Sequence, residues 1–182
     1  MKSKFGGPAV AMTVELLARA GVELIAGIGY CGGLRNEIKS GELVIPYASI
    51  RDESTSSRFV PDSFPAVADL DLWSYAMKAE SPAIRHSGVV WTTDAILLET
   101  SKDVQYWSHR GAVGVDMESA TLFVLSRLHS VRSFCVLVAS DNPLKRERTV
   151  LAALKIGRDR AISLVLQVLG QGLDCRHTAI TR

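Results

Sequence analysis

Two carboxylates stand inside the apolar segment 111–125, where their surroundings favour a chemical role. Asp116 and Glu118 follow an apolar run predicted as a strand, 112–115, and open a helix whose apolar positions recur at helical spacing. A carboxylate in apolar surroundings is costly unless a partner satisfies it. Glu118 could simply favour the first turn of the helix, where the helix dipole stabilises negative charge. That explanation does not account for its position beside Met117, so a ligand that donates hydroxyl groups is a second candidate partner.

A third carboxylate, Asp141, follows Ser140 at the end of a nearly continuous apolar run, 133–139, which predicts a strand buried on both faces. An Asp before Asn-Pro often only forms a turn. At the carboxyl end of a buried strand, however, burial can keep a carboxyl group protonated and able to act as a general acid. The sequence leaves both interpretations open.

The segment Gly27-Ile-Gly-Tyr-Cys-Gly32 has the spacing of a dinucleotide-binding fingerprint, and Asp52 lies twenty residues beyond its last glycine. That fingerprint must open a full helix, but only residues 34–39 are available before Gly41 and the next strand. We therefore predict that these glycines let backbone amides approach a ligand or a neighbouring strand. A turn without a ligand is the alternative.

Several basic side chains lie in predicted loops, among them the loop 51–64. Most basic loop residues are solvated, but one or two could hold an anion such as phosphate. The candidates are Arg51, Arg58, Lys145, Arg146 and Arg148.

Strand and helix patterns alternate along the chain. Strands are predicted at 23–28, 43–50, 87–93, 112–115 and 133–139. Helices are predicted from Pro8 to Gly21 and at 66–79, 102–110, 117–128 and 149–169. This alternation indicates an α/β fold of three layers, αβα, with helices on both faces of a mixed, mostly parallel sheet.

In such folds, ligands bind outside the carboxyl ends of the strands. Three predicted strands end in informative residues: at Gly29 and Tyr30, at 116–118, and at Ser140 and Asp141. If these strands are parallel, their ends line one crevice.

Length and composition describe an ordinary globular protein. A chain of 182 residues without a linker-like stretch fits one domain, 1–182, with a sizeable core. Its net charge of +2 gives no reason to expect nucleic acid or an acidic membrane as a partner. No apolar run reaches the length of a membrane span, and no signal peptide is evident. The three cysteines, Cys31, Cys135 and Cys175, lack metal-ligand spacing, so we expect no metal site and a reduced, cytoplasmic setting.

The segment Val115-Asp-Met-Glu-Ser-Ala120 resembles the Val-Glu-Met-Glu-Ala-Ala signature of the nucleoside phosphorylase family. That family includes hexameric purine nucleoside phosphorylases, uridine phosphorylases and methylthioadenosine nucleosidases. The resemblance covers nearly the whole chain, and its other segments are Gly6-Gly-Pro-Ala, Gly29-Tyr-Cys-Gly-Gly-Leu, Phe64-Pro-Ala-Val-Ala-Asp, Thr92-Thr-Asp94 and Val138-Ala-Ser-Asp.

The resemblance implies reversible phosphorolysis of a nucleoside to free base and pentose 1-phosphate. Phosphate would be a co-substrate, no cofactor would be needed, and the protein would be a homo-oligomer, a dimer or a hexamer. By the same resemblance, Glu118 would bind the ribose 2′- and 3′-hydroxyls, Met117 would pack on the sugar, and Asp141 would protonate a purine at N7.

The resemblance also implies the rest of the site. The remaining nucleoside contacts would be Val115, Asp116, Ser140, Thr93 and Ile96, the last of which stands, with Leu97, where purine enzymes carry a base-stacking aromatic pair. Phosphate would lie against Gly29, Tyr30 and Arg51. Ser140 and Asp141 follow the purine pattern, whereas the segment that begins at Phe64 looks most like uridine phosphorylases.

Departures from the family pattern leave three hypotheses. Gly27 and Tyr30 stand where the family carries an Arg and a Thr or Ser in its phosphate loop, Asp116 replaces the first Glu of the signature, and the chain lacks the family's N-terminal segment. An Arg-to-Gly change removes a bidentate, charge-assisted contact. The protein is then a phosphorylase that holds phosphate with other basic residues or a neighbouring subunit, a nucleoside hydrolase that uses water, or a non-catalytic nucleoside-binding relative.

Overall fold

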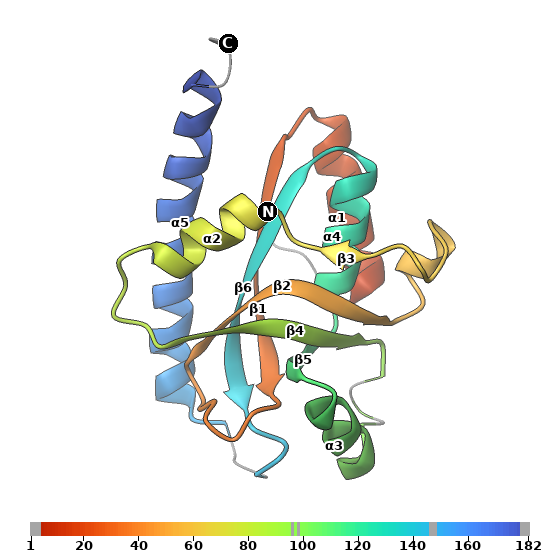
Figure 1. Cartoon of the computed structure of the whole chain (residues 1–182), viewed down its shortest axis with the longest axis vertical. Coiled ribbons are helices and arrows are strands. Elements are labelled where there is room, and N and C mark those ends of the chain that lie inside the picture. Colours follow the sequence, from red (N-terminus) through yellow and green to blue (C-terminus); the bar gives the residue numbers. More distant parts are fainter. Residues whose placement is uncertain (1–4, 96, 98, 146–148, 179–182) are drawn as a thin grey trace.

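The strands of this protein form one mixed sheet. The structure is a computed structural model that describes residues 5–95, 97, 99–145 and 149–178, and within these residues the sheet has six strands in the order β3-β2-β4-β5-β1-β6 (Figure 1). The strands are β1 (Leu24–Gly33), β2 (Leu43–Asp52), β3 (Ala66–Val67), β4 (Arg85–Thr93), β5 (Ala112–Asp116) and β6 (Arg132–Asp141). The long pairings, β1 with β6, β2 with β4 and β4 with β5, are parallel. The short pairings, β1 with β5, β2 with β3 and β2 with β6, are antiparallel.

Helices cover both faces of this sheet. They are α1 (Gly7–Arg19), α2 (Leu70–Lys78), α3 (Ser101–His109), α4 (Ser119–Leu128) and α5 (Leu151–Thr178), with a short 3-10 helix, η1 (Ser56–Arg58). Figure 1 shows α5 and α2 on one side of the sheet and α1 with α4 on the other. The predicted three-layer α/β fold with a mixed, mostly parallel sheet is confirmed.

Strand β6 carries the two main cores, one on each of its faces. Phe134, Val136 and Val138 pack against α2 and α5. The alternate residues, Cys135 and Leu137, pack against α1 and α4. All of them are buried, as the continuous apolar run predicts for a strand with helices on both faces.

The helix predicted for 66–79 is wrong in its first part. Ala66 and Val67 form β3 and pair with β2, and the helix begins only at Leu70. Asp69 sets this start, because its carboxylate accepts a hydrogen bond from the backbone N–H of Leu72 at 3.0 Å. The same carboxylate forms a bidentate ion pair with Arg132 of β6, whose charge and hydrogen bonds hold the pKa of Asp69 below its usual range despite its partial burial.

The glycines of segment 27–32 lie inside β1, which continues to Gly33 instead of opening a helix. A Cβ atom on Gly27 would lie 2.9 Å from Leu122 of α4 and 3.0 Å from Cys135 of β6. The predicted close approach of a neighbouring strand is therefore confirmed, and a dinucleotide fingerprint is excluded by the strand that runs through it.

We expect two glycines of α5 to respond in opposite ways to replacement by alanine. A Cβ on Gly157 would lie 2.5 Å from the Gly41 carbonyl oxygen and 2.7 Å from Val138. Gly157→Ala should therefore lower the free energy of unfolding by about 1–3 kcal/mol through overpacking. A Cβ on Gly170 meets no described atom within 4 Å, so Gly170→Ala should raise it by about 0.5–1 kcal/mol. Urea denaturation of both variants checks this, and equal shifts would contradict it.

Candidate active site

The ends of β1, β4, β5 and β6 meet at one end of the sheet. Gly32 of β1 pairs with Val115 of β5 on one side and with Asp141 of β6 on the other. Thr92 of β4 pairs with Asp116 of β5. Two of the three strand ends singled out from the sequence, at 116–118 and at Ser140 and Asp141, therefore lie beside Gly32. The first predicted strand does not end at Gly29 and Tyr30 but continues to Gly33, and β1 and β5 meet as antiparallel strands rather than parallel ones.

Asp116 lies in the interior of the fold, with only 2% of its surface exposed. Its carboxylate accepts hydrogen bonds from the Thr92 hydroxyl at 2.7 Å and from the Ser119 backbone N–H at 2.8 Å. The Ser119 hydroxyl continues this network to Ser49 at 2.7 Å. Asp116 and Ser119 thus connect the start of α4 to β4 and β2.

Burial raises the pKa of Asp116 to about 6, against the hydrogen bonds from Thr92 and Ser119 that lower it, and the charge of Glu118 raises it further. When the pKa of a carboxyl group is higher in the folded chain than in the unfolded chain, the group stabilises the fold. That stabilisation is complete at pH values below the pKa of the unfolded chain. That contribution is lost as the pH rises through about 6, when the buried group must ionise.

Asp116→Asn should remove this pH dependence. Between about pH 4 and pH 6.5, the free energy of unfolding of the wild type should fall relative to that of the variant by about 2 kcal/mol, which is most of the difference that a pKa shift from 3.8 to about 6 gives at about 1.36 kcal/mol per pKa unit. Urea denaturation at several pH values measures the difference. Asp62→Asn, whose side chain is 83% exposed, should follow the wild type. Parallel pH curves for the wild type and Asp116→Asn would contradict the prediction.

Glu118 precedes α4 but does not cap that helix with its side chain. Its carboxylate instead accepts a hydrogen bond from the backbone N–H of Gly6, at 2.7 Å and 112 residues away in sequence, and a longer one from Met117 at 3.3 Å. The side chain of Glu118 therefore makes no hydrogen bond that caps α4, and stabilisation of the helix start does not explain these contacts. Glu118 is half-buried, and a carboxylate has about four acceptor positions, so it retains capacity for donors from a ligand.

Asp141 is held at the end of β6 by its neighbours. The Ser140 hydroxyl donates to the Asp141 carboxylate at 2.6 Å. The next residue, Asn142, is fully buried and donates to the carbonyl oxygens of Arg35 and Ile38 at 2.8 and 2.9 Å. Asn142 thus makes the buried contacts of this turn, and the Asp141 carboxylate stays partly exposed.

Glu99 is a functional candidate that the sequence analysis missed. It lies between β4 and α3, is half-buried, and burial together with the charges of Asp141 and Asp103 raises its pKa to about 7. The signal in the sequence was a lone acidic residue directly after the apolar run 95–98. Its nearness to Asp141 follows only from the tertiary structure.

The other predicted nucleoside contacts have different surroundings. Thr93 is buried, and its hydroxyl accepts from the Ala95 N–H at 3.3 Å. Val115 is buried in the small core beneath α3. Ile96 lies outside the described residues, and its neighbour Leu97 is 96% exposed. Met117 is half-buried beside Glu118.

The guanidinium of Arg51 is already bound to other residues of the chain and is not available to phosphate. Its guanidinium donates to the hydroxyl of Ser56 and to the carbonyl oxygens of Val60, Pro61 and Phe64, and its side chain is only 5% exposed. These contacts clamp the loop 56–64 onto the end of β2. The expectation that Arg51 holds phosphate is therefore corrected: its donors are committed to the fold.

Of the other two phosphate candidates, Gly29 is half-buried and Tyr30 is exposed.

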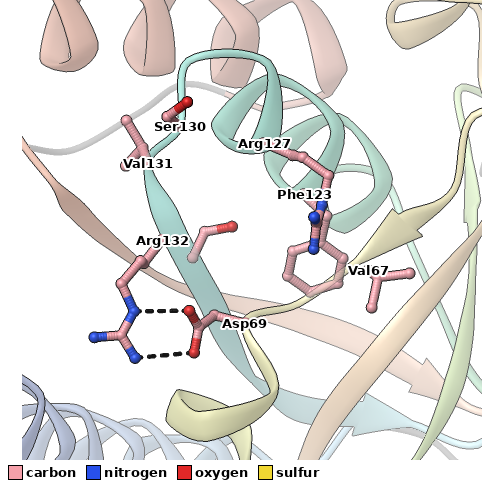
Figure 2. Close-up of a pocket in the computed structure, with 8 residues that line it drawn as sticks. Val67, Asp69, Phe123, Arg127, Ser130, Val131 and Arg132 are labelled. Carbon is pink, nitrogen blue, oxygen red and sulfur yellow. Dashed lines mark hydrogen bonds and ion pairs between the residues drawn. The ribbon is translucent and has the colours of Figure 1, made fainter.

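A hollow of about 250 Å³ lies elsewhere, at the start of β6 (Figure 2). Figure 2 shows the ion pair of Arg132 with Asp69 on its wall. Its lining residues are Val67, Asp69, Phe123, Arg127, Ser130, Val131, Arg132 and Ser133. Arg132 and Asp141 are the first and last residues of β6, so the hollow and the carboxylates are about 30 Å apart at the usual rise of a strand.

No helix in the described part of the chain is both long enough and apolar enough to cross a membrane.

Comparison with known proteins gives matches over most of the chain. The family model described as the phosphorylase superfamily matches residues 2–170. A guanosine phosphorylase of Halorubrum lacusprofundi is 30% identical over 139 residues, which are 75% of this chain and 58% of that protein. A uridine phosphorylase of Treponema pallidum is 33% identical over 160 residues, which are 80% of this chain and 62% of that protein. The chain thus spans about three fifths of the length of these curated relatives.

A solved structure has the same fold. The crystal structure of uridine phosphorylase from Vibrio fischeri superposes with a TM-score of 0.85 at 25% identity, and the match covers 93% of this chain and 72% of that one.

Proposed function

The chain belongs to the phosphorylase superfamily, and on that premise we propose that it catalyses the reversible phosphorolysis of a nucleoside to a free base and a pentose 1-phosphate. One observation carries the proposal. Glu118 follows β5 by two residues, Asp141 is the last residue of β6, and Gly32 of β1 pairs with both strands at that point. A carboxylate that can bind sugar hydroxyls and a carboxyl group that can act on the base therefore lie at neighbouring strand ends.

In the proposed reaction, a phosphate oxygen forms a bond to C1′ as the bond from C1′ to the base nitrogen breaks. The electron pair of that bond goes to the base, and for a purine the proton from Asp141 goes to N7. A protonated base is a better leaving group, because negative charge no longer develops on it. Glu118 accepts hydrogen bonds from the ribose hydroxyls and fixes the sugar, and the Ser140 hydroxyl orients Asp141.

A purine nucleoside is the substrate we favour. The support is Asp141 at the end of β6, because an acid at this place suits protonation of N7. The relatives that match this chain bear the names of guanosine, purine nucleoside and uridine phosphorylases, so their names do not select one base. The choice of a purine rests on Asp141.

Groups other than Arg51 would bind phosphate, because the guanidinium of Arg51 already donates its hydrogen bonds to the loop 56–64. Strand β1 pairs with β6 along one edge, and within the part of the chain that the structure describes, β5 pairs with its other edge at Gly32 and Gly33 only. Successive residues of a parallel strand direct their backbone groups to opposite edges, so of Gly29 and Tyr30 one directs its N–H to the edge away from β6, where we propose that the anion binds. Phosphate is the only co-substrate and no cofactor is part of the proposal.

We place the protein in the cytoplasm as a homo-oligomer, a dimer or a hexamer. The support for the oligomer is β1, whose pairing with β5 covers only Gly32 and Gly33 in the described residues and which carries two exposed apolar side chains, Ile28 and Tyr30, at 43% and 45% exposure. A second subunit that covers this edge could also supply basic groups to the phosphate. A monomer by light scattering at micromolar concentration would overturn this part of the proposal.

An assay of inosine, guanosine and uridine, each with and without phosphate, tests the function. We expect base release only when phosphate is present, and faster release from the purine nucleosides. Release without phosphate would assign a hydrolase, and no release from any nucleoside would assign a non-catalytic relative. Either result would overturn the proposed phosphorolysis.

A further inference from the structure

We propose that the hollow at the start of β6 binds a small organic anion, in which a carboxylate or phosphate group is joined to an apolar body (Figure 2). The volume of the hollow is about 250 Å³, below the range of about 300–1,000 Å³ for pockets that hold drug-sized ligands. The hollow lies at the opposite end of β6 from Asp141. The proposal is independent of the proposed function, because it uses none of the residues assigned to phosphorolysis.

Arg127 brings to the hollow a positive charge that no described residue balances. Its guanidinium makes no hydrogen bond or ion pair with a residue in the described part of the chain. Figure 2 shows its side chain next to that of Phe123, which lies one turn earlier on α4. Among the described residues of the wall the acidic one is Asp69, whose carboxylate accepts hydrogen bonds from Arg132 at 2.7 and 3.1 Å. Arg132 offsets the charge of Asp69, so the charge of Arg127 is left for an anionic ligand.

A nearly closed hydroxyl group on the wall also lacks a partner. Ser133 is only 4% exposed, and its hydroxyl makes no hydrogen bond with a described residue. Within the described residues, Ser126 holds the side-chain oxygen that is both sealed from solvent and unpartnered, so the oxygen of Ser133 opens into the hollow that it lines. A buried hydroxyl without a partner is costly, and the oxygen of an anionic ligand can accept its hydrogen bond.

Ser133 points toward the helix that carries Arg127. Side chains alternate between the two faces of a strand, and Ser133 shares its face of β6 with Cys135 and Leu137. Those two residues pack against α1 and α4. The guanidinium of Arg127 and the hydroxyl of Ser133 therefore lie on the same side of the sheet, where both line the hollow.

The backbone at Ser130 supports the same site. Helix α4 ends in two hydrogen bonds, from the Ser130 N–H to the Arg127 carbonyl oxygen at 3.1 Å and from the Val131 N–H to the Ser126 carbonyl oxygen at 2.8 Å. This helix end holds Ser130 at a φ of 56°, in the left-handed region where glycine is the usual residue. The hydroxyl of Ser130 lines the hollow and makes no hydrogen bond with a described residue. A ligand that uses this hydroxyl would account for a serine at a position where glycine is less strained.

Apolar side chains complete the wall and decide the second part of the ligand. They are Val67 of β3, Phe123 of α4 and Val131. Figure 2 shows Phe123 and Val67 on one side of the hollow. An inorganic anion would leave these side chains in contact with water, whereas an apolar body attached to the anionic group would cover them. We therefore assign the hollow to organic anions and not to inorganic phosphate or sulfate.

The experiment measures the binding of phenyl phosphate, benzoate and the neutral analogue benzamide by NMR titration at neutral pH. The wild type should bind phenyl phosphate or benzoate with a Kd of about 1 mM or lower, and benzamide at least about tenfold more weakly. The anion that binds more tightly identifies the anionic group as phosphate or carboxylate. Arg127→Met keeps most of the aliphatic stem and removes the charge, so the Kd of that anion should rise by about tenfold or more. Arg158→Met, at a 49% exposed position on α5, is the matched control and should bind as the wild type does.

Two serine variants distinguish a role in ligand binding from a role in stability. In Ser130→Gly the backbone strain is relieved, so its melting temperature should be higher than that of the wild type. The same variant loses a hydroxyl, so the Kd of the anion should rise by about twofold to tenfold. Ser133→Ala removes the other hydroxyl, and we expect a rise in the Kd of the same size.

The proposal is overturned if neither anion binds at millimolar concentration, if benzamide binds as tightly as the anions, or if Arg127→Met leaves the Kd unchanged. Unchanged affinity in both Ser130→Gly and Ser133→Ala would also overturn it. None of these results bears on phosphorolysis, which the nucleoside assay tests separately. If that assay releases no base while Arg127→Met weakens anion binding as expected, phosphorolysis is overturned and the anion site stands.

Discussion

Asp141→Asn is expected to lower kcat for a purine nucleoside by about 10²–10⁴-fold, the usual contribution of a general acid. Asparagine has nearly the same shape, and its side-chain oxygen can still accept the hydrogen bond that Ser140 donates at 2.6 Å. It cannot deliver a proton to N7 at neutral pH. The loss should therefore appear in kcat, with a smaller change in KM. Steady-state kinetics with inosine and phosphate measures both constants.

A modified substrate separates the chemical role of Asp141 from a structural one. In 7-methylguanosine a methyl group occupies N7 and the base already carries a positive charge, so no proton has to be delivered. Asp141→Asn should turn over this nucleoside at close to the wild-type rate. Asp159→Asn, at a half-exposed position on α5, is the matched control and should behave as the wild type with both substrates. Equal losses with inosine and 7-methylguanosine would show that Asp141 only shapes the site.

Glu118→Gln is expected to weaken nucleoside binding or turnover by about tenfold to a thousandfold. A hydrogen bond to a charged acceptor is worth about 1.5–3 kcal/mol, and each 1.4 kcal/mol is a factor of about ten. The glutamine oxygen can still accept from the Gly6 N–H, the bond of 2.7 Å that positions this side chain, so the change is mainly one of charge. A 2′-deoxynucleoside should lose less from the substitution than the ribonucleoside, because it lacks one of the two hydroxyls.

Thermal unfolding of Glu118→Gln distinguishes a role in ligand binding from a role in the stability of α4. If Glu118 only stabilised the start of α4, Glu118→Gln would lower stability by about 0.3–1 kcal/mol and leave affinity unchanged. Glu80→Gln, an exposed glutamate on another part of the chain, is the control for a lost surface charge. Unchanged nucleoside affinity with a lowered melting temperature would remove Glu118 from the site and most of the proposed function with it.

The sequence by itself determined the elements whose patterns are local. The apolar run at 133–139 predicted β6, and its alternating contacts with helices on both faces follow from that run. The alternation of strands and helices predicted the α/β fold, and the segment from Val115 to Ala120 predicted the family, which the comparisons confirmed. These results depend on periodicity and on short motifs, which a single sequence displays directly.

Tertiary structure decided which groups share a site and which are already committed. Glu118 accepts from Gly6, 112 residues away, and Arg51 uses its donors within the loop 56–64. Burial, together with the charges of Asp141 and Asp103, raises the pKa of Glu99 to about 7. The helix predicted from residue 66 instead begins at Leu70, because β3 pairs with β2. Each of these outcomes depends on hydrogen bonds, charge and burial between segments distant in the chain, and no local pattern encodes those distances.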